Sequence, residues 1–316
     1  MFDQILVPLD RSSLAECVLP HAVALAHSLG AQLLLLHVLS LPNAQDRLRA
    51  VDALEWQLRR AEAENYLKGV CTRMAETGVS CTAQVRDGDA AEQIVACANE
   101  EGIGLVLIAS HGQSGISAWH ISSVVQKVIS RAHTSLMIIR AVEPDQPDIA
   151  SLRYRHLLVP LDGSARAECV LPLAAALTRA PETQILLTHL VQRPEMPRRI
   201  PLSREDSELA DRLVERNFSE AEAYLKGVRG QLPSNTTETR LQITDQVADS
   251  LHDLVEQADI DLVLLCAHGY SGKMRWLYGS VVASFILYGS SPLLIFQDAP
   301  LEQNAASMGN QENSRR

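Results

Sequence analysis

The chain of 316 residues consists of two similar halves, and this internal repeat constrains its fold more than any other feature. Three segments of the first half return in the second half, in the same order and displaced by 152 to 158 residues. The pairs are "ILVPLDRSSLAECVLP" at 5–20 with "LLVPLDGSARAECVLP" at 157–172, "AEAENYLKGV" at 61–70 with "SEAEAYLKGV" at 219–228, and "LVLIASHGQSG" at 105–115 with "LVLLCAHGYSG" at 262–272. Two copies of domain length, about 145 residues each, indicate a duplicated domain and not a short solenoid repeat.

The stretch "AVEPDQPDIAS" marks the boundary between the copies, because it is rich in Pro and Asp and has no periodicity. The segment from Pro300 onward is polar, with almost no large apolar residue. We therefore predict a first domain at 1–142, a linker at 143–152, a second domain at 153–298 and a disordered tail at 299–316.

Apolar runs alternate with helical patterns in each half. For the first half, the expected strands are Ile5–Leu9, 32–39, Ser80–Arg86, Leu105–Ala109 and Leu136–Arg140, and the expected helices are Leu14–Leu29, about Asp46–Glu76, Ala90–Asn99 and Ser122–Ala132. This alternation predicts an α/β fold with two tandem, doubly wound, Rossmann-like domains, each with a five-stranded parallel sheet. The last strands of the two domains, at 136–140 and 293–296, are apolar and are expected to face each other, because each would otherwise be an exposed edge.

Charge and composition exclude several classes of protein. The formal net charge of -10 argues against a nucleic-acid partner. The first residues lack the basic region of a signal peptide, and no apolar run is long enough to insert into a membrane. The six cysteines form no CxxC pair and no ligand set, so we expect free thiols, a cytoplasmic location and no metal site.

Two loops of each half follow strands at the edge where open parallel sheets bind ligands. In the second half they are "VPLDGS" and the glycine-rich "AHGYSGKMRWLYGS", which leads into a helix expected to begin at Ser280. Free backbone amides at a helix start, together with glycines, form an anion site. Asp162 in the first loop is a candidate acceptor for hydrogen bonds from a base or ribose.

The same residues have structural explanations that the sequence leaves open. Asp10 and Asp162 are also typical turn or helix caps, and His111 and His268 are suited to positioning a loop. His37 and His189, within apolar strands, are expected in the core or in a pocket wall.

Known nucleotide and hydrolase motifs do not match. "AHGYSGKM" is not a P-loop, because Ala267 stands at the leading Gly and Met274 at the Ser/Thr. The chain has no G-x-S-x-G elbow, and no G-x-G-x-x-G follows the first strand.

The "VPLDGS" start, the later "AHGYSG", and Gly269 followed by Gly279-Ser280 resemble the universal stress protein family over nearly the whole chain outside the linker and tail. Nucleotide-binding members carry G-x2-G-x9-G-[ST]. The resemblance implies a five-stranded parallel α/β fold, ATP bound without a Walker motif, and dimerisation through the last strand. A tandem chain would build that dimer internally, as a pseudo-dimer, and the sequence leaves open whether two chains form a further homodimer.

Each copy departs from the family pattern. The second half has Cys266 in place of the first Gly, whereas the first half has Ala109 there and Ser122-Ser123 in place of Gly-Ser. Because Gly279 allows a closer backbone approach than Ser122, we expect stronger binding in the second half. The nucleotide-binding residues that the resemblance implies are Pro160, Asp162, Leu190, Cys266, His268, Gly269, Gly272, Gly279, Ser280 and Val281. The weaker first-half set is Pro8, Asp10, Val38, Gly112, Gly115, Ser122 and Ser123.

The function that we predict is a stress-response regulatory protein that binds an adenine nucleotide, ATP with or without Mg²⁺, and acts on a protein partner that the sequence does not identify. Asp162 and Leu190 would meet the adenine or ribose, and the glycine-rich loop and Val281 would surround the phosphates. No catalytic residue is predicted, and any ATP hydrolysis would be slow. The alternatives are a nucleotide-free interaction scaffold, and an enzyme that uses His268 and Asp162 on a phosphorylated substrate.

Overall fold

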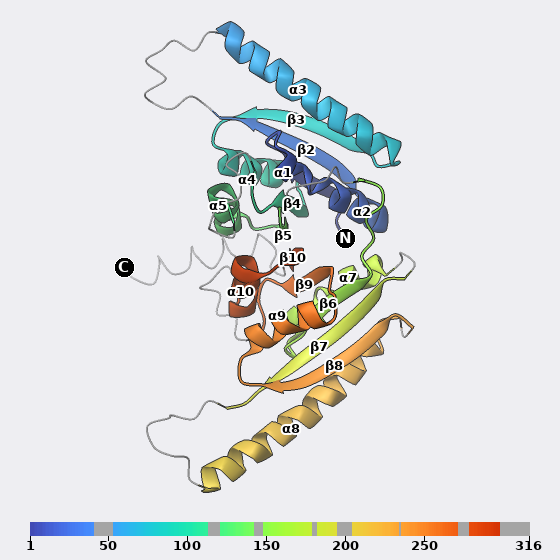
Figure 1. Cartoon of the computed structure of the whole chain (residues 1–316), viewed down its shortest axis with the longest axis vertical. Coiled ribbons are helices and arrows are strands. Elements are labelled where there is room, and N and C mark those ends of the chain that lie inside the picture. Colours follow the sequence, from blue (N-terminus) through green and yellow to red (C-terminus); the bar gives the residue numbers. More distant parts are fainter. Residues whose placement is uncertain are drawn as a thin grey trace, which may run out of the picture.

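The strands of both halves form a single sheet. The computed structural model describes residues 1–40, 53–112, 121–141, 148–178, 182–194, 204–233, 235–270 and 278–297. The sheet has ten strands in the order β3-β2-β1-β4-β5-β10-β9-β6-β7-β8, with helices on both faces (Figure 1). The order of the second half repeats that of the first, so the predicted pair of five-stranded α/β units is confirmed.

The elements of the two halves correspond one to one. In the first half they are β1 (Gln4–Pro8), α1 (Ser13–Glu16), α2 (Leu19–Leu29), β2 (Gln32–Leu39), α3 (Ala53–Glu76), β3 (Cys81–Asp87), α4 (Ala90–Glu100), β4 (Leu105–Ala109), α5 (Ser123–Arg131) and β5 (Ser135–Ile139). In the second half they are β6 (His156–Pro160), α6 (Ala165–Glu168), α7 (Leu171–Leu177), β7 (Gln184–Gln192), α8 (Arg204–Arg229), β8 (Thr237–Thr244), α9 (Val247–Gln257), β9 (Leu262–Cys266), α10 (Ser280–Tyr288) and β10 (Leu293–Phe296).

The two halves join through their last strands. Strands β5 and β10 pair antiparallel, with Leu294 opposite Met137, whereas the strands within each half pair in parallel. Arg140 of the first half donates hydrogen bonds of 2.6 and 2.9 Å to the carbonyl oxygens of Phe285 and Ile286, near the end of α10. The expectation that the end strands face each other is confirmed, and their pairing removes two apolar sheet edges.

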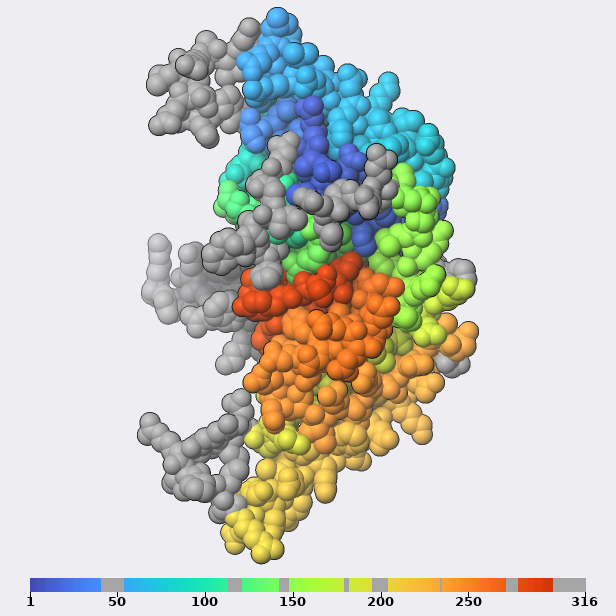
Figure 2. Space-filling model, viewed as in Figure 1, coloured from blue at the N-terminus to red at the C-terminus, as the bar shows by residue number. Residues whose placement is uncertain are grey.

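The hydrophobic cores run across this junction. One core lies between the sheet and α1, α2, α3, α7 and α8, and it includes both Met137 and Leu294. The other lies between the sheet and α4, α5, α9 and α10, and it includes Ile138 and Leu293. Because successive residues of a strand point to opposite faces, β5 and β10 contribute to both cores. The space-filling view shows the halves in contact along a broad boundary (Figure 2).

Two local features differ from the sequence-based expectation. The helix expected from Leu14 to Leu29 is divided into α1 and α2, because Pro20, in the first turn of α2, has no amide hydrogen to donate to the carbonyl oxygen of Glu16. Cys71 of α3 and Cys81 of β3 form a disulfide with a Cα–Cα distance of 5.5 Å, so the expectation of six free thiols is wrong. The nine residues between these cysteines hold no ligand motif, and only the packing of α3 on β3 brings the two thiols together.

Some expectations fall on residues that the structure does not describe. They are the beginning of the long helix before residue 53, the linker residues 143–147 and the tail from 299 onward. Among the described helices, none combines the length and apolarity that crossing a membrane requires.

Candidate functional site

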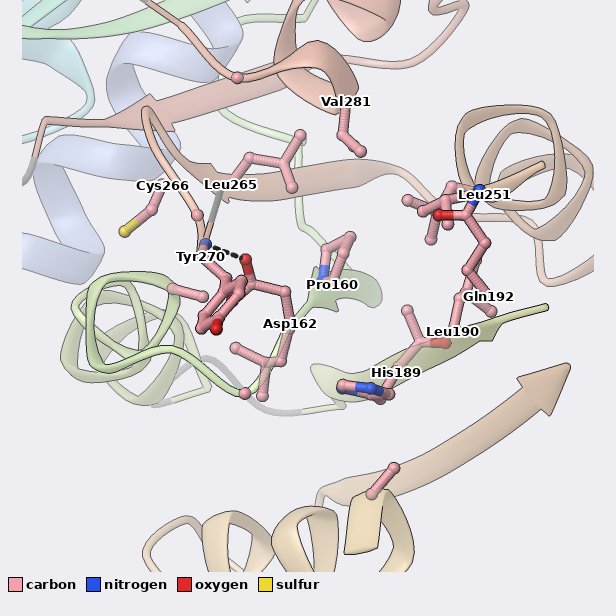
Figure 3. A pocket seen from close by; sticks show the side chains of 18 of the residues that line it. Pro160, Asp162, His189, Leu190, Gln192, Leu251, Leu265, Cys266, Tyr270 and Val281 are labelled. Atoms are coloured by element: carbon pink, nitrogen blue, oxygen red, sulfur yellow. Dashed lines mark hydrogen bonds between the residues drawn. The ribbon is translucent and has the colours of Figure 1, made fainter. Parts of the chain in front are cut away.

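A cleft of about 720 Å³ opens in the second half at the carboxyl ends of β6, β7 and β9 and at the start of α10 (Figure 3). The neighbours β6 and β9 mark the point where the strand order of this half reverses. Open α/β sheets bind ligands at such a point. This volume is within the range of small-molecule sites, about 300–1,000 Å³.

The structure brings the predicted residues of the second half together around this cleft. Its lining includes Pro160, Asp162, Leu190, Cys266, His268, Gly269, Gly279, Ser280 and Val281. Gly272 lies outside the described residues. The lining also includes residues that the sequence analysis missed, among them Thr188, Tyr224 and Leu251. These three lie within strand and helix patterns and belong to no binding motif, although alignment of the two repeats does show that Thr188 replaces Leu36.

Asp162 organises the loops at one end of the cleft. Its Oδ1 atom accepts hydrogen bonds from the backbone amide and the hydroxyl of Ser164, at 3.0 and 2.6 Å. Its Oδ2 atom accepts a hydrogen bond of 2.5 Å from the amide of Tyr270, seen as the dashed line in Figure 3. The carboxylate therefore holds the loop after β6 against the loop after β9, which is the capping role that the sequence left open.

Gly269 has a steric reason to be glycine. A Cβ atom at this position would overlap the carboxylate of Asp162. In the first half, a Cβ at Gly112 would overlap the carboxylate of Asp10 in the same way. The pairing of the first loop's Asp with the second loop's Gly is thus a repeated part of the fold.

The start of α10 presents backbone amides to the cleft. Gly279 is the N-cap residue and, as a glycine, has no side chain with which to cap the helix. In the first half the matching residue, Ser122, accepts a hydrogen bond of 3.3 Å from the amide of Val125 and so caps α5. The amides at the start of α10 therefore lack the N-cap side-chain partner that Ser122 provides at α5.

One wall of the cleft is aliphatic and the other is more polar. Leu190, Leu251, Leu265 and Val281 line the cleft beside α9 and α10. On the α8 side, the rings of His189 and Tyr224 meet edge to face, with centroids 6.0 Å apart. Burial lowers the pKa of His189, although the nearby Asp162 carboxylate acts in the opposite direction. The imidazole is therefore favoured in its neutral form.

The first half has a smaller cleft at the matching place, with a volume of about 460 Å³. Its lining includes the predicted residues Pro8, Asp10, Val38, Gly112, Ser122 and Ser123, whereas Gly115 lies outside the described residues. The repeat pairs Arg11 and Arg59 of this lining with Gly163 and Asn217 of the larger cleft.

Arg11 lines this smaller cleft and connects its first loop with α3. It pairs with Glu62 of α3, with a distance of 3.2 Å between the guanidinium nitrogen and the carboxylate oxygen. Its backbone has a positive φ of 70°, as does Gly163, whose φ is 82°. A long side chain therefore stands at a turn position where the second half has only a hydrogen atom.

The site shows no sign of metal chemistry in its described part. No group of three or more His, Cys, Asp or Glu side chains suited to a metal ion occurs among the described residues.

The fold and the two clefts define a class of protein, a tandem α/β chain with one cleft at the carboxyl edge of the sheet in each repeat. The profile of the universal stress protein family matches residues 1–140 and 153–297, and the chain belongs to this family.

Two curated relatives and one solved structure illustrate the similarity. Universal stress protein MJ0577 of Methanocaldococcus jannaschii is 24% identical over 155 residues, which are 44% of this chain and 96% of the relative. Universal stress protein YxiE of Bacillus subtilis is 27% identical over 154 residues, 44% of this chain and 100% of the relative. The crystal structure of a universal stress protein from Archaeoglobus fulgidus covers 94% of this chain and 96% of its own, with a TM-score of 0.62 and 14% identity, which supports the tandem fold alone.

Proposed function

We propose that this universal stress protein binds an adenine nucleotide, ATP, in its second half and acts as a nucleotide-dependent regulatory module. The observation that carries the proposal is the uncapped start of α10 at the edge of the larger cleft. Helix starts of this kind bind phosphate groups through backbone amides and the helix dipole.

The residues present fit a nucleotide. Among the described residues, the nearest atom to a Cβ added at Gly279 would be the carbonyl oxygen of Ala267 at 3.8 Å, an ordinary van der Waals contact. The phosphates would lie there, against the amides of Ser280 and Val281. The base would lie in the aliphatic part of the cleft beside Leu190, with the ribose between them. Mg²⁺, where present, would be carried by the phosphates.

The asymmetry between the halves supports binding in the second half. The matching helix α5 is already capped by Ser122, and the first cleft is smaller and is lined by Arg11 where the second half has Gly163. A side-chain cap uses one of the amides that a phosphate would need. The first half is therefore proposed as the weaker site or as a structural half.

A direct test is calorimetric titration of the full chain with ATP and Mg²⁺, together with analysis of any nucleotide released when the purified protein is denatured. We expect one strong site for each chain. A chain that releases no nucleotide and gives no heat with ATP would instead be a nucleotide-free scaffold. Product formation over many turnovers would point to an enzyme.

A further inference from the structure

The aliphatic walls of the two clefts correspond position by position, with a single polar exception. Four of the positions that are aliphatic in both halves are the pairs Val38 with Leu190, Ile94 with Leu251, Ile108 with Leu265, and Val124 with Val281. A further position is Leu36 in the first half and Thr188 in the second.

The backbone confirms that Leu36 and Thr188 are equivalent. Leu36 lies opposite Pro8 in the sheet, and Thr188 lies opposite Pro160. The carbonyl oxygen of each accepts a hydrogen bond of 2.8 Å from the residue that follows the facing proline. Both side chains are 0% exposed. The two halves therefore differ here in side-chain chemistry and not in backbone position.

The hydroxyl of Thr188 lacks a hydrogen-bond partner within the described part of the chain. Leaving a buried hydroxyl unpaired is unfavourable, and a leucine or valine at this position would avoid that penalty. The first half shows that the fold accepts an aliphatic residue here. The second half retains a donor and acceptor that the ligand-free protein does not use.

We propose that Thr188 is a specificity-determining residue, whose hydroxyl hydrogen-bonds a polar edge atom of a heteroaromatic base seated among Leu190, Leu251 and Val281. This inference rests on the proposed nucleotide function and deepens it. A heteroaromatic base suits this part of the cleft, because the flat faces of the base are weakly polar while its edge carries ring nitrogens and amino groups. A ribose or a phosphate in the same place would lose its hydrogen bonds to water and gain only one polar partner, the hydroxyl of Thr188, which is unfavourable.

The test compares three variants of the full chain with the parent. Thr188→Val removes the hydroxyl and keeps the shape, and Thr188→Ser keeps the hydroxyl. The matched control, Leu36→Thr, places a hydroxyl at the equivalent position of the first half. Each protein is titrated calorimetrically with ATP, adenosine and inorganic triphosphate at a fixed Mg²⁺ concentration, and each is unfolded thermally.

We expect Thr188→Val to weaken ATP and adenosine by the same factor of about ten, equivalent to about 1.4 kcal/mol. Thr188→Val and the parent should have the same affinity for inorganic triphosphate, because the substitution changes only the part of the cleft proposed to hold the base. Thr188→Ser should bind ATP within about threefold of the parent, about 0.7 kcal/mol. The melting temperature of Thr188→Val should equal or exceed that of the parent, whereas Leu36→Thr should melt lower and bind ATP normally.

Each alternative outcome contradicts the inference in a recognisable way. If the parent binds ATP and Thr188→Val binds it equally well, Thr188 does not contact the base and the proposed function still stands. If Thr188→Val weakens inorganic triphosphate as much as ATP, the residue acts through the fold. If the parent binds no nucleotide, the proposed function fails and this inference fails with it.

Discussion

Replacing Gly279 with valine tests the phosphate site most directly. Gly279 has φ of -68° and ψ of 163°, an extended conformation that valine adopts without strain. The nearest contact of the new Cβ would be at 3.8 Å, an ordinary van der Waals distance. Valine is a poorer N-cap residue than glycine, so we expect a loss of about 1 kcal/mol in the free energy of unfolding. A margin of roughly 5–15 kcal/mol tolerates this loss.

The loss of ligand binding should be much larger. Each hydrogen bond from an amide to a charged phosphate contributes about 1.5–3 kcal/mol, and the branched side chain would occupy the space that the phosphate oxygens need. We therefore expect ATP to bind Gly279→Val at least about 100-fold more weakly, a change of about 2.7 kcal/mol.

The matched control is Ser122→Val, which removes the cap of α5 and also loses about 1 kcal/mol of stability. Both variants should keep the circular dichroism spectrum of the parent and melt a few degrees lower, whereas only Gly279→Val should lose ATP in calorimetric titration. Equal ATP affinity in the parent and in Gly279→Val would refute the phosphate site at α10. Equal losses in the two variants would show that general destabilisation is the cause.

Three further predictions concern the loops and the stability of the fold. Gly269→Ala should displace the loop that Asp162 holds and weaken ATP binding by at least about tenfold, roughly the contribution of one charged hydrogen bond, with titration as the measurement. Cys71→Ser should lower the free energy of unfolding by about 3 kcal/mol, because the disulfide to Cys81 closes a short loop, and a reducing agent should lower the stability of the parent but not of the variant in denaturant titration. Burial lowers the pKa of His21 to about 4, so the unfolded chain binds more protons than the folded chain between that pH and about 6.5. Stability should therefore fall by as much as about 3 kcal/mol as the pH drops through this window, and His21→Gln should show a flatter profile; an unchanged slope would contradict the assignment.

The strands and helices were largely readable from local patterns. The strand expected at Leu105–Ala109 has those bounds, and the helix expected to begin at Ser280 begins there. Both segments carry their signal within a few residues, as a continuous apolar run or as a glycine followed by a helical pattern. The division of the first helix before Pro20 was missed, because the apolar periodicity continues through a break that the backbone chemistry of proline imposes.

The candidate site could be predicted only in part from the sequence. The glycine loop and Asp162 stand out as motifs, and they do line the cleft, but their roles toward a ligand stay predictions. Thr188 differs visibly from Leu36 once the repeats are aligned. That the hydroxyl is fully buried and unpaired depends on residues of several elements packed around it.

The sequence by itself determined that the chain is a duplicated α/β unit, because periodicity and motif spacing are properties of neighbouring residues. The tertiary structure decided what depends on distant residues. It joined β5 and β10 into one sheet, paired Cys71 with Cys81, and showed Ser122 capping α5, whereas the N-cap residue of α10 is a glycine. These outcomes depend on which surfaces the folded chain brings into contact, and a linear pattern carries no direct record of such contacts.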